Sequence, residues 1–402
     1  MLQPLLVFSL LSLLVAACGV GKSSSQNNRQ QAAQVQQTTL RTGAQQDHLY
    51  VEWLKGKKVG LVLNQTAIYD SKTHLVDFLR QQNINITRIF VPEHGFRGTA
   101  DAGEHVKNGI DPQTKIPLMS LYGQDKKPKP EYIKDLDILL FDIQDVGARF
   151  YTYISTLHYL MEACAEHNKP LIVLDRPNPN GHYVDGPIRQ QGFSSFVGVH
   201  PIPIVHGLTV AELAQMINGE KWLRNGLQCE LKLIHCKNYT HQTPYILPVR
   251  PSPNLKDSAA IWLYPSLCLF EGTPLSVGRG TPLSFRIFGH PNLPQNQFSF
   301  VPKADEGNKK PIFENQICYG TDLSHLTAPL QKLDISYLLK AYEQYPEKAQ
   351  FFTPFFDKLA GDSTLRICIQ KGMTEAEIRQ TWQKDLNRYR VMRKKYLLYP
   401  EN

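Results

Sequence analysis

Apolar and polar positions alternate in blocks along the first half of the chain. Short, continuously apolar runs are separated by stretches in which apolar residues recur every three or four positions. The first pattern is typical of strands buried on both faces, and the second of amphipathic helices. Together they predict a parallel sheet covered by helices, a Rossmann-like α/β fold. The predicted strands lie in 57–64, 86–93, 138–141, 169–179 and 227–239, and the predicted helices in 71–83, 151–168 and 208–223.

The turn after the first predicted strand argues against a dinucleotide cofactor. It reads NQTAIYD and contains no GxGxxG, the glycine pattern that lets a helix N-terminus approach a pyrophosphate. A glycine-rich phosphate nest is missing as well. We therefore predict that the protein uses no cofactor.

The pattern changes near residue 248, where Pro and Gly become dense and the apolar runs become short. The last predicted helix begins with a capping box formed by Thr374 and Glu377. We therefore predict a Rossmann-like catalytic domain at 49–245 and a smaller α+β domain at 246–402. The apolar stripe of the last helix is expected to face the core, and it consists of Ile378, Trp382, Leu386 and Tyr389.

The first residues predict export. The apolar run that ends at Ala17 has the length of a signal-peptide core and is short for a membrane span. Small residues before Cys18 resemble the lipobox of bacterial lipoproteins, and 18–48 has too few large apolar residues to fold. We predict a signal peptide at 1–17, a lipid anchor on Cys18, a disordered tether, and a location on the periplasmic side of the inner or outer membrane. An ordinary secretory signal is the alternative.

The other six cysteines are scattered and show no CxxC spacing, so a metal knuckle is not predicted. Cys229 and Cys236 are the closest pair along the chain and could form a disulfide after export. Buried free thiols are the alternative.

The chain is basic, with 44 Lys and Arg against 36 Asp and Glu and a formal net charge of +8. For an exported protein this balance favours anionic surroundings such as phospholipid or cell-wall polymer. Basic runs interleaved with aromatic residues, which single-stranded nucleic acid requires, are not apparent. Nucleic acid is therefore not a predicted partner.

Polar side chains gather where three predicted strands end. Ligands of open α/β sheets bind at the carboxyl ends of the strands, so we expect these residues on one rim. Asp145 could instead cap a helix, Asp175 and Arg176 could form a structural ion pair, and one of the two tyrosines is expected to face the core. The candidates are Glu93, His94, Asp142, Gln144, Asp145, Arg149, Tyr151, Tyr153, Asp175, Arg176, Asn178 and Asn180.

These side-chain types favour a polyhydroxylated ligand, because carboxylates and amides exchange hydrogen bonds with sugar hydroxyls and tyrosines offer ring faces. A nucleophilic serine would require a GxSxG elbow, which is absent. His94, Glu104 and His105 lie near one another but not at the spacing of a helical zinc motif, so no metal is predicted.

The second half adds two charged candidates. Glu271 ends an apolar run, and Arg279 lies in the glycine-rich loop that follows. A turn carboxylate and a loop-bracing guanidinium are the plain interpretations. The functional interpretation is a second wall of the site, with Arg279 able to bind a carboxylate through two donors.

Several long motifs, in order, resemble the DUF1343 family, which includes the exo-β-N-acetylmuramidases called NamZ. The resemblance runs from about residue 50 to the end. It implies an active site between a Rossmann-like domain and a smaller C-terminal domain, and release of N-acetylmuramic acid from the non-reducing end of peptidoglycan fragments such as MurNAc-GlcNAc. It also implies that Glu93 is the leading catalytic candidate.

Pro274 and the segment after Gly280 depart from the family pattern, which leaves open the substrate preference that this loop determines. The motifs are VPEHGFRG, DAGE, FDIQDVGARFYTYI, LDRPNPNG, HGLTVAELA, PSPNL, YPSLCLFEGT, SVGRGT and YLLYP.

Glycoside hydrolysis requires a proton donor and a second carboxylate. We assign Glu93 as the general acid, with His94 orienting it. The second carboxylate stays open, and Asp142 and Glu271 lead a group that also contains Asp145, Asp175 and Glu104. Arg279 or Arg149 could bind the lactyl carboxylate of muramic acid, and Tyr151 and Tyr153 could stack on sugar rings.

Two other classes of protein remain open. A lipoprotein that binds wall saccharides without turnover would have the same fold and the same cleft. An esterase or amidase acting on wall components is the third possibility, although no nucleophile motif supports it.

Overall fold

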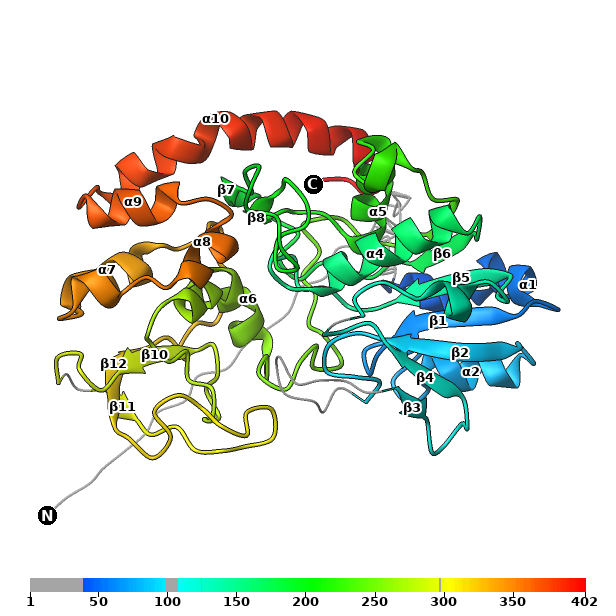
Figure 1. Ribbon diagram of the computed structural model, residues 1–402, viewed down its shortest axis with the longest axis horizontal. Coiled ribbons are helices and arrows are strands. Elements are labelled where there is room, and N and C mark those ends of the chain that lie inside the picture. The colour runs from blue at the N-terminus through cyan, green and yellow to red at the C-terminus, as the bar shows by residue number, and fades with distance from the viewer. Residues whose placement is uncertain (1–38, 98–107, 124, 296–297) are drawn as a thin grey trace, which may run out of the picture. The chain divides into compact units, whose positions relative to one another are not determined.

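Seven strands of the described chain form one sheet, with the order β3-β4-β2-β1-β5-β6-β9 (Figure 1). The computed structural model describes residues 39–97, 108–123, 125–295 and 298–402. All pairs in the sheet are parallel except β3 with β4, so the predicted parallel sheet is confirmed. The strands are β1 (Val59–Leu63), β2 (Ile86–Val91), β3 (Gly109–Ile110), β4 (Pro117–Ser120), β5 (Ile138–Asp142), β6 (Leu171–Leu174) and β9 (Leu231–Ile234).

Helices cover both faces of this sheet because side chains along each strand point alternately to opposite sides. In β5, Leu139 and Phe141 join one hydrophobic cluster, whereas Ile138 and Leu140 join another. All five residues of β1 and of β5 are buried, which explains why both strands are apolar in the sequence up to Asp142, the last residue of β5. The helices are α1 (Val51–Leu54), α2 (Leu75–Gln81), α3 (Pro130–Ile133), α4 (Tyr153–Glu166) and α5 (Val210–Gly219).

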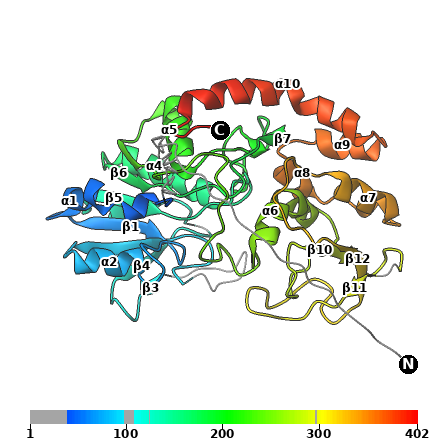
Figure 2. The same ribbon diagram turned by 180° about the vertical axis from the view of Figure 1, so that it is seen from behind.

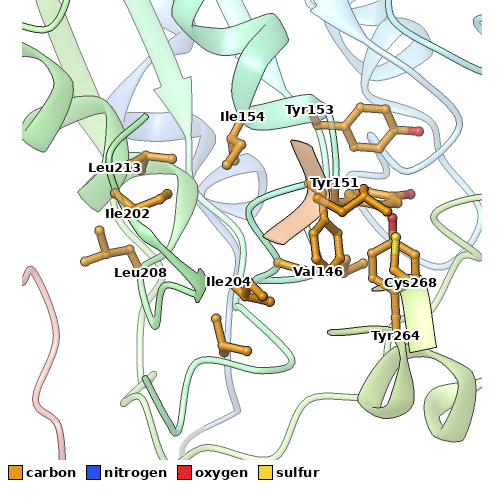
Figure 3. Packing of buried hydrophobic residues seen from close by; sticks show 14 of the residues in the cluster. Val146, Tyr151, Tyr153, Ile154, Ile202, Ile204, Leu208, Leu213, Tyr264 and Cys268 are labelled. Atoms are coloured by element: carbon orange, nitrogen blue, oxygen red, sulfur yellow. The ribbon is translucent and has the colours of Figure 1, made fainter. Parts of the chain in front are cut away.

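The smaller C-terminal domain contains a three-stranded antiparallel sheet and several helices. The larger hydrophobic cluster continues into it, so the predicted boundary at 245/246 does not separate two cores. Figure 3 shows this continuity, with Ile202, Leu208 and Leu213 at one end and Tyr264 and Cys268 at the other. The elements are α6 (Ser258–Leu267), β10 (Ile287–His290), β11 (Ser299–Phe300), β12 (Cys318–Asp322), α7 (Ser336–Gln344), α8 (Pro354–Ala360), α9 (Thr364–Gln370) and α10 (Glu375–Arg393).

The last helix, α10, packs on an antiparallel ribbon of the first half, β7 (Asp185–Ile188) and β8 (Pro203–Val205). Figures 1 and 2 show it running from α9 to the neighbourhood of α5. The Trp382 indole donates to Asp185, and the Tyr389 hydroxyl donates to the backbone oxygen of His206. The whole predicted apolar stripe of this helix is buried, as expected.

Folded structure begins earlier than the predicted tether boundary allows. Arg41 forms a backbone bridge with Lys237, and the Gly43 amide donates to the Asp175 carbonyl. A Cβ at Gly43 would lie 2.3 Å from the Ile234 carbonyl oxygen, so this close approach requires glycine. The prediction was wrong for 39–48 because backbone pairing, which composition does not reveal, orders this polar segment. The signal peptide, Cys18 and 18–38 lie outside the described residues, so the lipid anchor stays a prediction.

The Arg149 side chain is buried and joins distant parts of the chain. Its guanidinium donates to the carbonyls of Pro187 and Ile202 beside the β7–β8 ribbon, and to those of Leu359 and Ala360 at the end of α8. Burial lowers the pKa of Arg149 to about 9, which still leaves it charged at neutral pH. These bonds use both terminal nitrogens, so we do not retain Arg149 as a substrate-binding residue.

We expect Arg149→Met to lower the free energy of unfolding by about 3–5 kcal/mol, because four carbonyls lose charged donors at once. Urea denaturation followed by circular dichroism measures the change. Arg388→Met is the matched control, since Arg388 is exposed on α10, and we expect it to cost less than about 0.5 kcal/mol. Equal losses in the two variants would contradict the role given to Arg149.

Candidate active site

A cavity of about 450 Å³ lies between the first half and the C-terminal domain. It brings together five of the residues predicted from the sequence. Residues of α8 and of the loop that precedes α3 complete its walls. The predicted residues that line it are Glu93, His94, Tyr151, Glu271 and Arg279.

Glu93 and His94 follow the end of β2 in a tight turn. His94 has a φ of 70° and Gly95 a φ of 72°, so two consecutive residues take the left-handed conformation that reverses the chain. This conformation is costly for a residue with a side chain and is often found at functional sites. The Thr152 hydroxyl, at the start of α4, donates to Glu93 Oε2 at 2.9 Å. Gly98, the other glycine of the motif, lies outside the described residues.

Aromatic rings form one wall of the cavity. Tyr151 meets both Tyr264 and Tyr153 edge to face, with ring centroids 5.6 and 4.8 Å apart (Figure 3). Burial raises the pKa of Tyr151 well above its usual value, so its hydroxyl remains protonated. The oxygen of that hydroxyl is itself buried, so Tyr151 contributes its ring to this wall of the cavity. Tyr153 instead donates to the Pro251 carbonyl and does not line the cavity.

Glu271 and Arg279 form an ion pair beside this aromatic wall, because Arg279 lies over the Phe285 ring, which packs edge to face on Tyr264. Arg279 Nε and Nη2 both donate to Glu271 Oε1, at 2.9 and 2.7 Å. Burial alone would lower the pKa of Arg279, but the Glu271 carboxylate outweighs this effect and the pKa is raised. Glu271 therefore stands in the cavity beside a fixed positive charge. The sequence suggested each residue separately but gave no sign that they pair.

Lys126 is a cavity residue that the sequence patterns did not single out. It lies between β4 and α3, and its ammonium group is 4.9 Å from the centroid of the Phe196 ring. No carboxylate of the described chain lies within ion-pair distance of it. The basic run DKKPK, which contains Lys126, follows β4. The sequence patterns did not predict β4, because none of its residues is buried, and so they did not predict a strand before this run.

Both halves of the chain match models of one protein family. The model described as "Exo-beta-N-acetylmuramidase NamZ, N-terminal" matches residues 59–259, and its C-terminal counterpart matches 262–399. The chain belongs to the NamZ family. The peptidoglycan beta-N-acetylmuramidase NamZ of Bacillus subtilis is 39% identical over an alignment of 379 residues, and the match covers 87% of this chain and 89% of that protein.

Two crystal structures of DUF1343 family proteins from Bacteroides fragilis share the NamZ fold seen here. One is 45% identical, with a TM-score of 0.84, and the match covers 91% of this chain and all of that chain. The other is 29% identical, with a TM-score of 0.76, and the match covers 90% of this chain and 99% of that chain. The fold predicted from the motifs is thereby confirmed.

The remaining rim residues of this NamZ family member do not line the cavity. Asp142 and Arg176 form a buried two-point ion pair at 2.5 and 2.8 Å, and Arg176 also donates to the Ile68 carbonyl. The Gln144 amide donates to the carbonyls of Asp145 and Pro177. With its carboxylate held by Arg176, Asp142 lies outside the cavity that contains Glu93 and Glu271.

Asn178 and Asn180 connect loops by similar bonds. Asn178 donates to the Leu208 carbonyl, and Asn180 donates to the carbonyls of Val146 and Ile261. Asp145 accepts from the Gly147 amide. A Cβ at Gly147 would lie 2.2 Å from Asn178 Oδ1, so the two loops touch closely. These contacts position the loop that carries Tyr151 and Thr152.

Metal and disulfide sites are not formed by the described residues. No group of three His, Cys, Asp or Glu side chains among them could hold a metal ion. Their six cysteines, Cys229 and Cys236 included, are buried free thiols. No helix in the described segments combines the length and apolar character needed to cross a membrane.

Asp175 is buried and accepts hydrogen bonds from the Tyr399 hydroxyl and the Ala211 amide. Burial raises its pKa from 3.8 to about 6, although these bonds oppose the shift. An acid whose pKa is higher in the folded state favours folding when protonated. Its contribution to stability is therefore lost as the pH rises from about 4 to about 6.

We expect Asp175→Asn to remove this loss, because an amide does not ionise. From pH 4 to pH 6.5, the free energy of unfolding of the variant should gain ~2 kcal/mol relative to the wild type. Urea denaturation at several pH values measures the difference. Asp385→Asn, at a half-exposed position on α10, is the control and should show the same pH dependence as the wild type. Parallel profiles for Asp175→Asn and the wild type would refute the assignment.

Proposed function

We propose that this protein is a glycoside hydrolase that releases N-acetylmuramic acid from the non-reducing end of peptidoglycan fragments. The observation that carries the proposal is the cavity in which Glu93, held by Thr152, stands with the Glu271–Arg279 pair. Family membership and the activity named for the Bacillus subtilis relative support it. No cofactor is required for this reaction.

In this proposal Glu93 is the general acid. Its proton passes to the glycosidic oxygen as the bond to C1 of muramic acid breaks, water supplies the new hydroxyl at C1, and the other proton of that water restores the protonated acid. Phe150 and Tyr151 exclude water from that wall, and Thr152 fixes the orientation of the carboxylate.

Glu271 is the candidate for the second carboxylate. Its ion pair with Arg279 holds it in a fixed orientation, as required of a group that attacks C1, activates water or stabilises positive charge on the sugar. Asp142, the other leading candidate, already uses both carboxylate oxygens on Arg176 and lies outside the cavity. We therefore assign the second role to Glu271.

The lactyl carboxylate of muramic acid requires a cation. Arg149 does not line the cavity and donates to backbone carbonyls, and Arg279 is engaged by Glu271. Lys126 lines the cavity with no carboxylate of the described chain beside it. We therefore assign recognition of the lactyl group to Lys126.

Glu93→Gln should reduce release of muramic acid from MurNAc-GlcNAc by at least about 100-fold, because the amide cannot donate the proton. Product is measured by chromatography, and an unchanged urea midpoint confirms folding. Glu131→Gln, at an exposed position on α3, is the control and should retain full activity. Variant activity within about tenfold of the wild type removes Glu93 from the acid role, and a wild type that binds without turnover would identify a receptor.

Lys126→Ala should lower kcat/KM for a chromogenic β-MurNAc glycoside by about 10–100-fold, because the bound carboxylate loses its counter-charge. The same glycoside carrying a methyl ester on the lactyl group should be much less affected, and Lys126→Arg should recover part of the activity. Arg279→Ala should impair both substrates alike, since it acts through Glu271. Equal losses on acid and ester with Lys126→Ala would reassign the lysine.

A further inference from the structure

A second, larger cavity of about 1,020 Å³ adjoins the site. Three segments line both cavities: the turn from Glu93 to Arg97, the segment that begins at Ser252, and the loop that begins at Arg279. Ser252 itself borders both. The two cavities are therefore consecutive parts of one cleft, and we call the second one the outer groove.

The outer groove carries cations that no acidic group of the described chain neutralises. Two of its basic residues already have partners, because Arg97 pairs with Asp111 and Lys256 with Asp305. Arg250 and Lys303 are exposed in the groove and form no ion pair with any described residue. Such a wall suits a ligand with a carboxylate.

The acidic residues of the groove do not neutralise the positive charges of Arg250 and Lys303. Asp257 is held by Arg286 at 2.7 Å, and Asp305 is held by Lys256. Glu306 is exposed and is the remaining acid. Two cations, Arg250 and Lys303, thus face one unpaired carboxylate.

The position of the groove relative to Glu93 identifies the part of the substrate that reaches it. A general acid protonates the leaving oxygen, so the leaving chain begins beside Glu93. The turn that carries Glu93 continues to Arg97 in the wall of the groove. A leaving chain that follows this turn enters the groove after its first sugar. In an alternating glycan that first sugar is N-acetylglucosamine, and the next is again N-acetylmuramic acid with a lactyl carboxylate.

Building on the proposed function, we propose that the outer groove binds the leaving glycan and that Arg250 and Lys303 recognise the carboxylate of its first muramic acid. The enzyme then prefers a peptide-free tetrasaccharide, MurNAc-GlcNAc-MurNAc-GlcNAc, over the disaccharide MurNAc-GlcNAc. Because the two cations are exposed, the gain in kcat/KM is modest, about threefold to tenfold.

The test compares kcat/KM on these two substrates for the wild type and the double variant Arg250→Ala/Lys303→Ala. The variant should match the wild type on the disaccharide and lose the preference for the tetrasaccharide. A trisaccharide with a neutral third sugar, MurNAc-GlcNAc-GlcNAc, should show no preference in either protein. Arg388→Ala/Lys340→Ala removes the same charge from exposed positions outside the groove and should behave as the wild type.

Other results would contradict the proposed role of the outer groove or the proposed function. A wild type without chain-length preference, or a double variant that keeps it, removes the groove from substrate binding. A preference that persists with the neutral third sugar shows that the groove does not recognise a carboxylate. Equal loss on both substrates assigns the two cations to the fold. A wild type that hydrolyses neither substrate overturns the proposed function itself, which is a separate result.

Discussion

The buried guanidinium of Arg149 is the contact on which the site depends. It joins the loop after β5 to the β7–β8 ribbon and to the end of α8. Tyr151 and Thr152 follow on the same loop, and Thr152 holds Glu93. Leu359, one of the four acceptors, is itself a cavity residue. One cation therefore positions both walls. Gly361 leaves room for it, because a Cβ there would lie 2.7 Å from Arg149 Nη2.

Polar residues at the strand ends divide into two layers with different tasks. The buried layer, which includes Asp142, Arg176 and Asn178, satisfies backbone groups of neighbouring loops and lies outside the cavity. The second layer is partly buried, lines the cavity and holds the charges available to a ligand. In buried sites, unpaired polar groups are costly, so the first layer must be satisfied within the protein before the second can be presented to substrate. The groups of the second layer are Glu93, Lys126, Glu271 and Arg279.

The sheet was predictable because burial on both faces imposes an unbroken apolar run on each central strand. In the same sheet, β3 and β4 are not buried on both faces and were not predicted from the sequence. No residue of β4 is buried, and β3 has two exposed residues, so neither has a distinctive pattern. The segment 39–48 was assigned to a tether because its order comes from backbone bonds to Lys237 and Asp175, which depend on distant parts of the chain.

The sequence by itself determined the parallel sheet, the family and the position of Glu93 at a strand end, because local patterns and long motifs encode each of these. Only the tertiary structure decided which rim residues face the cavity. Arg149 and Arg279 are both arginines in loops, yet one is buried among carbonyls and the other lines the site. The pairing of Glu271 with Arg279 and the placement of Lys126 opposite Phe196 also became visible only in three dimensions. The type of a residue determines which groups its side chain can bind, whereas packing between distant segments determines which groups that side chain contacts.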